Sequence, residues 1–93
     1  MPLVTLSWTH GCKHLCMIAG SWSQFTPQVL VPMRLETGNE IWTTQVKLPD
    51  NVDDTIIRYK FIVDGEWTVD QDMPVMANEL GSRDNYIKIQ VNP

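Results

Sequence analysis

A β-hairpin can be recognised in the run Tyr59-Lys60-Phe61-Ile62-Val63-Asp64-Gly65-Glu66-Trp67. Asp-Gly between β-branched and aromatic residues predicts a two-residue type I′ turn, because both turn positions need a positive φ. A turn of this kind sets the register of the two strands. The expected pairs are Val63 with Glu66, Ile62 with Trp67, Phe61 with Thr68 and Lys60 with Val69.

The two faces of this hairpin differ in chemistry. Side chains alternate between faces along a strand, so one face carries the apolar residues Ile57, Tyr59, Phe61 and Val63, which we expect in the core. The other face carries Lys60 and Trp67 at diagonal positions, within reach of one ligand. Ile62 shares this second face, so the alternative is that it also packs against another part of the protein.

The composition limits the class of protein. The chain has 93 residues, is 43% hydrophobic and carries a formal charge of −4. These totals predict one globular domain over residues 1–93, either a whole protein or a domain excised from a longer chain. The acidic balance disfavours nucleic acid and anionic membranes as partners, because phosphate binding needs a basic face. Without a long apolar run or a leader pattern, we expect a cytoplasmic protein.

Short β-strands account for most of the chain, and no segment has convincing helical periodicity. Seven strands are expected, over residues 3–8, 15–19, 31–36, 40–48, 55–63, 66–69 and 85–91. Pro32 places the third strand at a sheet edge. Residues 49–54 are expected to form an acidic loop, and residues 70–78 an irregular one. This pattern predicts an all-β fold, an immunoglobulin-like antiparallel β-sandwich.

The four tryptophans have different expected roles. Trp8 and Trp42 alternate in phase with core positions of their strands, and Trp22 should close one end of the sandwich. Trp67 lies opposite the apolar set, where an exposed ring could stack on the C–H face of a sugar. Phe25, in the loop after Trp22, could supply a second stacking surface.

Neither a metal site nor a catalytic site is expected. His10, Cys12, His14 and Cys16 alternate, but four such residues on one strand span ~20 Å and cannot close around one ion. They are expected to be surface or turn histidines and two unpaired thiols. Known nucleophile, zinc-protease and phosphate-loop motifs are absent from the sequence, so we expect no enzyme activity and no cofactor.

Several of these motifs together resemble a known family. The hairpin run, Pro74, the segment Asn78-Glu79-Leu80-Gly81 and Asn85 are similar to the glycogen-binding domain of the AMP-activated protein kinase β subunit, a family 48 carbohydrate-binding module. Ser7-Trp8-Thr9 and Gly20-Ser21-Trp22 also match the pattern. The resemblance extends from about residue 4 to residue 91.

The resemblance implies a non-catalytic β-sandwich that binds α-1,4-linked glucans such as glycogen, starch or maltooligosaccharides. The residues that it assigns to sugar binding are Trp67, Lys60, Phe25, Leu80, Ser82 and Asp84. Leu80 is expected to enter the concave side of the ligand. Phe25 and Asp84 stand where the family usually has tryptophan and asparagine. Phe25 offers less stacking area and an ionised Asp84 only accepts hydrogen bonds, so both changes weaken the expected affinity.

Several functions remain open on the sequence alone. The first is a glucan-binding module that brings a kinase or phosphatase catalytic domain to its substrate. The second is a protein-interaction or scaffold domain that kept the fold and lost sugar binding, as Phe25 and Asp84 could indicate. A nucleic-acid-binding relative is disfavoured by the negative charge. An accessory domain of a glucan-branching or debranching enzyme is the fourth.

Overall fold

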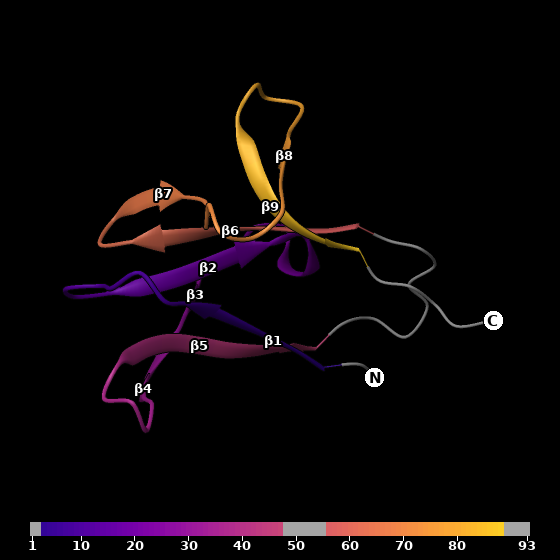
Figure 1. The fold of residues 1–93 in the computed structure, drawn as a ribbon. Helices are drawn as coiled ribbons and strands as arrows, with labels where there is room; N and C mark the ends of the chain where they lie inside the picture. Colours follow the sequence, from indigo (N-terminus) through magenta and orange to yellow (C-terminus); the bar gives the residue numbers. More distant parts are fainter. Residues whose placement is uncertain (1–2, 48–55, 89–93) are drawn as a thin grey trace.

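Two antiparallel β-sheets form the protein in a computed structural model that describes residues 3–47 and 56–88 (Figure 1). The strands are β1 (Leu3–Trp8), β2 (Cys16–Gly20), β3 (Gln28–Val29), β4 (Val31–Arg34), β5 (Glu40–Lys47), β6 (Ile56–Val63), β7 (Glu66–Thr68), β8 (Val75–Ala77) and β9 (Arg83–Lys88). A 3-10 turn, η1 (Ser21–Ser23), follows β2. Within the described ranges, no helix is long and apolar enough to cross a membrane.

The smaller sheet has the strand order β1-β5-β4, and the larger one has the order β3-β2-β6-β9-β8 with β7 also paired to β6. β4 lies at an edge, as its proline predicted, because a central strand would need the missing N–H. The two sheets face each other as two layers, and the β8–β9 hairpin extends beyond them as an arm (Figure 1). This arrangement confirms the predicted antiparallel β-sandwich.

The core lies between the two layers and follows the alternation of the strands. Its buried members include Leu6, Trp8, Ile18, Val46, Tyr59 and Phe61. The ring centroids of Trp8 and Phe61 are 5.1 Å apart. The rings of Tyr59 and Phe61 form a T-shaped pair with centroids 5.7 Å apart. Burial raises the pKa of the Tyr59 hydroxyl, because the phenolate would lose its hydration. Trp22 and Trp42 are half-buried against this cluster, so both have the expected structural role.

The predicted hairpin is confirmed with its register. Asp64 and Gly65 have φ values of 51° and 88°, and the paired residues are Phe61 with Thr68, Ile62 with Trp67 and Val63 with Glu66. The expected fourth pair, Lys60 with Val69, is not formed, because β7 ends at Thr68 and the chain turns toward β8. Ile62 is buried, whereas Trp67 on the same face is 52% exposed.

Within residues 3–47 and 56–88, nine strands are observed instead of the seven predicted for the chain. The two additional ones are β3, which pairs with β2, and β8, which pairs with β9. Both strands are short. Pro74 lies immediately before β8, and a proline at that position predicts a loop instead of a strand. Residues 70–78 are therefore not irregular throughout, because the segment lies along β9, where its backbone groups find partners.

Several observed strand ends differ from the predicted ones by one or two residues. β2 begins at Cys16, because the Leu15 N–H donates a hydrogen bond to the carboxylate of Asp64. β4 ends at Arg34, where the turn to β5 begins. β9 begins at Arg83, two residues before its predicted start. Leu48, the acidic loop 49–54 and the predicted strand residues 89–91 lie outside the described residues.

Candidate functional site

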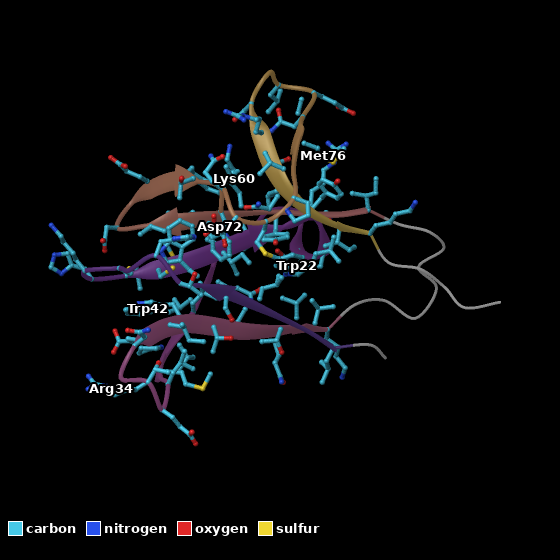
Figure 2. All side chains as sticks on the ribbon, in the orientation of Figure 1. Trp22, Arg34, Trp42, Lys60, Asp72 and Met76 are labelled. Carbon is cyan, nitrogen blue, oxygen red and sulfur yellow. The ribbon has the colours of Figure 1, made fainter. Side chains whose placement is uncertain are left out.

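The surface face of β6 carries a row of cations. Arg58 and Lys60 alternate with the buried Tyr59 and Phe61, so they point away from the core. Figure 2 shows Lys60 between β7 and the arm formed by β8 and β9. Its ammonium group donates a hydrogen bond to the hydroxyl of Ser82 at 2.8 Å. Lys60 therefore links the central strand of the larger sheet to the turn at the tip of the arm.

The tip of the arm is shaped by one amide side chain. The Oδ1 of Asn78 accepts hydrogen bonds from the backbone N–H groups of Leu80 and Ser82, both at 3.0 Å. Gly81 completes the turn with a φ of 81°, which favours glycine. As a result the Leu80 side chain points into solvent and is 93% exposed. An apolar side chain held this far from the core is available to a ligand.

A hollow of about 350 Å³ lies between the arm and the sheet. Its lining residues are Phe25, Arg58, Lys60, Asn78, Glu79, Leu80, Ser82 and Asp84. Five of the six residues assigned to sugar binding by resemblance are therefore close together, although they are far apart in the sequence. The lining combines apolar groups with convergent polar groups, which is typical of a small-ligand site.

Trp67 lines a neighbouring hollow of about 260 Å³. Lys60 and Ser82 border both hollows, so their hydrogen-bonded pair joins the surface of Trp67 to the first hollow. The Trp67 ring is half-exposed on a strand whose register is set by the turn before it. Together the two hollows form one continuous surface, which we call the β6 groove.

Phe25 reaches the β6 groove from the loop after η1. Gln24 and Phe25 both have left-handed backbone angles, with φ of 55° and 59°, and the Phe25 N–H donates to the Gly20 carbonyl at 2.8 Å. Trp22 lies directly over Gly20, where a Cβ would overlap its ring, and its Nε1 donates to Gln28. Trp22 thus supports the loop, while Phe25 is 36% exposed.

Asp84 differs in its setting from the other predicted site residues. Its side chain is almost fully buried, and its Oδ1 accepts a hydrogen bond from the Nδ2 of Asn78 at 3.2 Å. The carboxylate, on β9 of the arm itself, therefore binds the Asn78 side chain at the turn and also lines the hollow. Its direct contact with a ligand stays a prediction.

Three further residues line the hollow without having been predicted as site residues, namely Arg58, Asn78 and Glu79. Arg58 could have been found, because it precedes Lys60 by two residues on the same face of the strand. Asn78 and Glu79 approach the hollow through the folding of the arm, which the sequence did not reveal. Two cationic and two anionic side chains line the hollow, so its formal charge is balanced. Such a lining suits a neutral ligand with many hydroxyl groups.

The turn of the β6–β7 hairpin is tied to the β1–β2 loop. The carboxylate of Asp64 accepts hydrogen bonds from the backbone N–H groups of Lys13, His14 and Leu15, at 2.9, 2.7 and 3.0 Å. These bonds hold the pKa of Asp64 well below its usual range, because they stabilise the charged form. The residue that makes the turn therefore also anchors a distant loop.

Both thiols have the raised pKa that opposes nucleophilic chemistry. Burial, followed by the proximity of Cys12, raises the pKa of the fully buried Cys16 to about 12. Desolvation and the nearby Asp64 carboxylate also raise the pKa of Cys12. A reactive cysteine needs the opposite, an electropositive setting that lowers its pKa. The Cys16 thiol lies beside that of Cys12, whereas His14 is exposed.

Comparison with known proteins gives one family. A family model described as the glycogen recognition site of AMP-activated protein kinase matches residues 2–93. Similar proteins include a SNF1-related protein kinase regulatory subunit beta-2 from Arabidopsis thaliana, 28% identical over 91% of this chain, and a 5'-AMP-activated protein kinase subunit beta-1 from Sus scrofa, 30% identical over 89%. A phosphoglucan phosphatase from Castanea sativa, DSP4, amyloplastic, is 26% identical over 94% of this chain.

The match covers only part of these relatives. It spans 26% of the Arabidopsis subunit, 60% of the Sus scrofa subunit and 22% of the Castanea phosphatase. The similarity therefore concerns a segment of each of these proteins, two of them named as kinase subunits and one as a phosphatase.

Proposed function

The chain belongs to the family of glycogen recognition sites of AMP-activated protein kinase, and on this premise we propose that it binds α-1,4-linked glucan without catalysing a reaction. The observation that carries the proposal is the exposed Trp67 ring on a strand of set register, beside Lys60 and the hollow under the arm. A flat aromatic ring next to hydroxyl-binding groups is suited to a sugar chain.

Each part of the β6 groove has a proposed role. Trp67 and Phe25 stack on the apolar faces of glucose rings, and each stacked ring contributes about 1–2 kcal/mol. Lys60 and Ser82 exchange hydrogen bonds with sugar hydroxyls. The exposed Leu80 inserts into the concave side of the curved glucan. Two stacking surfaces and a few hydrogen bonds support an affinity of roughly micromolar to millimolar Kd.

Recruitment of an enzyme to glucan is the proposed biological role. The relatives are named as kinase subunits and as a phosphoglucan phosphatase, so the partner proposed for this module is a kinase or phosphatase catalytic domain. The module itself then supplies binding and leaves the chemistry to the partner. Two unpaired thiols agree with a reducing compartment, and the cytoplasm is the location that we propose.

Calorimetric titration with maltoheptaose tests this function. Wild-type protein should bind with saturation, and Trp67→Ala should weaken binding about 5–30-fold, the equivalent of about 1–2 kcal/mol. Met33→Ala is the matched control, because Met33 is a similarly exposed apolar residue on β4 of the other sheet. Binding that is unchanged in Trp67→Ala would contradict the assignment of the β6 groove.

A second candidate is a protein-interaction domain with weak or no sugar binding. Phe25 offers a smaller stacking surface than tryptophan, and the carboxylate of Asp84 is buried and already bonded to Asn78. Absence of saturation by the wild type at millimolar maltoheptaose would favour this candidate over glucan binding.

A further inference from the structure

Three potential metal ligands meet outside the β6 groove. His10 lies in the β1–β2 loop, while Asp70 and Asp72 lie in the segment from β7 to β8, where Figure 2 labels Asp72. The Nε2 of His10 is 2.8 Å from the Oδ1 of Asp70 and 3.4 Å from the Oδ2 of Asp72. All three ligand atoms lie within 4.8 Å of one another.

The positions of these groups are set by their surroundings. Asp70 has a side chain that is only 5% exposed, and its backbone is bound on both sides by the buried Asn85. The Asn85 Oδ1 accepts from the Asp70 N–H at 2.8 Å, and its Nδ2 donates to the Asp70 carbonyl at 2.9 Å. The His10 and Trp8 rings pack in a T-shaped arrangement, with their centroids 4.9 Å apart. One carboxylate and one imidazole are thus held in place before any ligand arrives.

The spacing suits a small divalent cation. Two ligands at about 2.0–2.1 Å from a tetrahedral Zn²⁺ are about 3.3 Å apart, and the two separations from His10 lie on either side of that value. In the hydrogen-bonded form, the proton of His10 Nε2 occupies the space beside Asp70, because a carboxylate only accepts. A metal ion takes that position when the proton is on Nδ1 and the Nε2 lone pair is free.

Charge and ligand chemistry narrow the choice of ion. With a neutral imidazole the cluster carries two negative charges, one of them on a nearly buried carboxylate, and a divalent cation neutralises them. Imidazole selects Zn²⁺ and similar transition ions over Mg²⁺ and Ca²⁺, which prefer oxygen ligands. We propose that His10, Asp70 and Asp72 form a Zn²⁺ site, with water completing the coordination.

This site connects two loops on one side of the sandwich. Asp70 follows Trp67 by three residues, so an ion bound here ties the end of the stacking strand to the β1–β2 loop. The proposal depends on neither glucan binding nor its test, because none of the three ligands lines the β6 groove. The ion is expected to act on stability.

Thermal unfolding with Zn²⁺ and with a chelator tests the proposal. At a free Zn²⁺ concentration 100-fold above Kd, the melting temperature of the wild type should rise by roughly 10–20 °C over the chelated sample. The rise should be lost in His10→Gln and reduced in Asp72→Asn. Both residues are exposed, so these variants should still fold. Calorimetry should show one ion bound to each chain.

Two controls separate this site from other zinc ligands in the same loop. His14→Gln removes an exposed histidine four residues away, and Cys12→Ser removes the nearby partly exposed thiol. Both should keep the full rise in melting temperature. Co²⁺ bound at the site should show no thiolate charge-transfer band. No rise in the wild type, a rise unchanged in His10→Gln, or a rise lost in either control would overturn the proposal.

Discussion

The two hairpins that border the β6 groove are held in different ways. In the β6–β7 hairpin, the side chain of Asp64 accepts hydrogen bonds from the N–H groups of residues 13–15, about fifty residues away. In the β8–β9 hairpin, Asn78 accepts hydrogen bonds from Leu80 and Ser82 within its own turn. Each turn uses one polar side chain to satisfy backbone donors. The donors that Asp64 satisfies lie in a distant loop, whereas those that Asn78 satisfies lie in its own turn.

This difference separates stability from ligand binding. The inner face of β6 contributes Tyr59 and Phe61 to the core, whereas the tip of the arm contributes an almost fully exposed Leu80. A change in the first hairpin should therefore lower the free energy of unfolding of the whole domain. A change at the tip of the second should alter the β6 groove and leave the sandwich intact, because Leu80 lies outside the core.

Truncating one apolar residue in each hairpin tests this separation most strongly. Phe61→Ala should lower the free energy of unfolding by about 3–5 kcal/mol, because it leaves a cavity in the core. Leu80→Ala should change it by less than about 0.5 kcal/mol, because the residue is exposed. Urea unfolding of both variants measures the two values. A large loss of stability in Leu80→Ala would show that the arm is part of the cooperative core.

Removing the amide that shapes the arm should have an intermediate effect. Asn78→Ala leaves the Leu80 and Ser82 N–H groups without their acceptor, so the tip should lose its shape and maltoheptaose binding should weaken roughly 5-fold, the equivalent of about 1 kcal/mol. The melting temperature should also fall by a few degrees, approximately, because the nearly buried Asp84 carboxylate loses the Nδ2 donor of Asn78. Calorimetry and a thermal scan measure the two effects.

A conservative change at the same position provides the control. Asn78→Ser keeps an oxygen that can accept hydrogen bonds from the following backbone, so it should lose less affinity than Asn78→Ala. Equal losses in both variants would indicate that the Nδ2 contact with Asp84 matters more than the shape of the turn.

The smallest expected effect is the pH dependence contributed by Asp64. Its pKa is lowered in the folded protein, so its contribution to stability is complete above the unfolded pKa of about 4 and is lost as the pH falls below that value. Asp64→Asn keeps an acceptor oxygen and a side chain that tolerates positive φ, but it cannot titrate. The melting temperature of the wild type should therefore fall a few degrees more than that of Asp64→Asn between pH 6 and pH 3, approximately.

The other carboxylates are shared by both proteins, so the difference between the two pH profiles isolates Asp64. Parallel profiles would mean that the hydrogen bonds from residues 13–15 form equally well to a neutral acceptor. The charge of Asp64 would then add nothing, and the two turns would differ only in which backbone N–H groups their side chains bind.

The features that could be predicted from the sequence are those that depend on residues close together along the chain. The Asp64-Gly65 turn sets the register of its own strands, so the positions of Lys60 and Trp67 followed from alternation. The same alternation places Arg58 on the face of β6 that carries Lys60. The assignment of Leu80 and Ser82 came from resemblance, since nothing in their local sequence predicts an exposed arm. β8 was missed because Pro74 and the polar residues around it resemble a loop.

The sequence by itself determined the alternating strands, the turn at residues 64–65 and the two faces of β6, because these depend on neighbours along the chain. The tertiary structure decided that Trp67 is exposed while Ile62 on the same face is buried, and that Phe25 and Asp84 border one hollow. It also brought His10 to Asp70 across sixty residues. Such contacts depend on how the two sheets and their loops pack, and the separation along the chain carries no local signal for them.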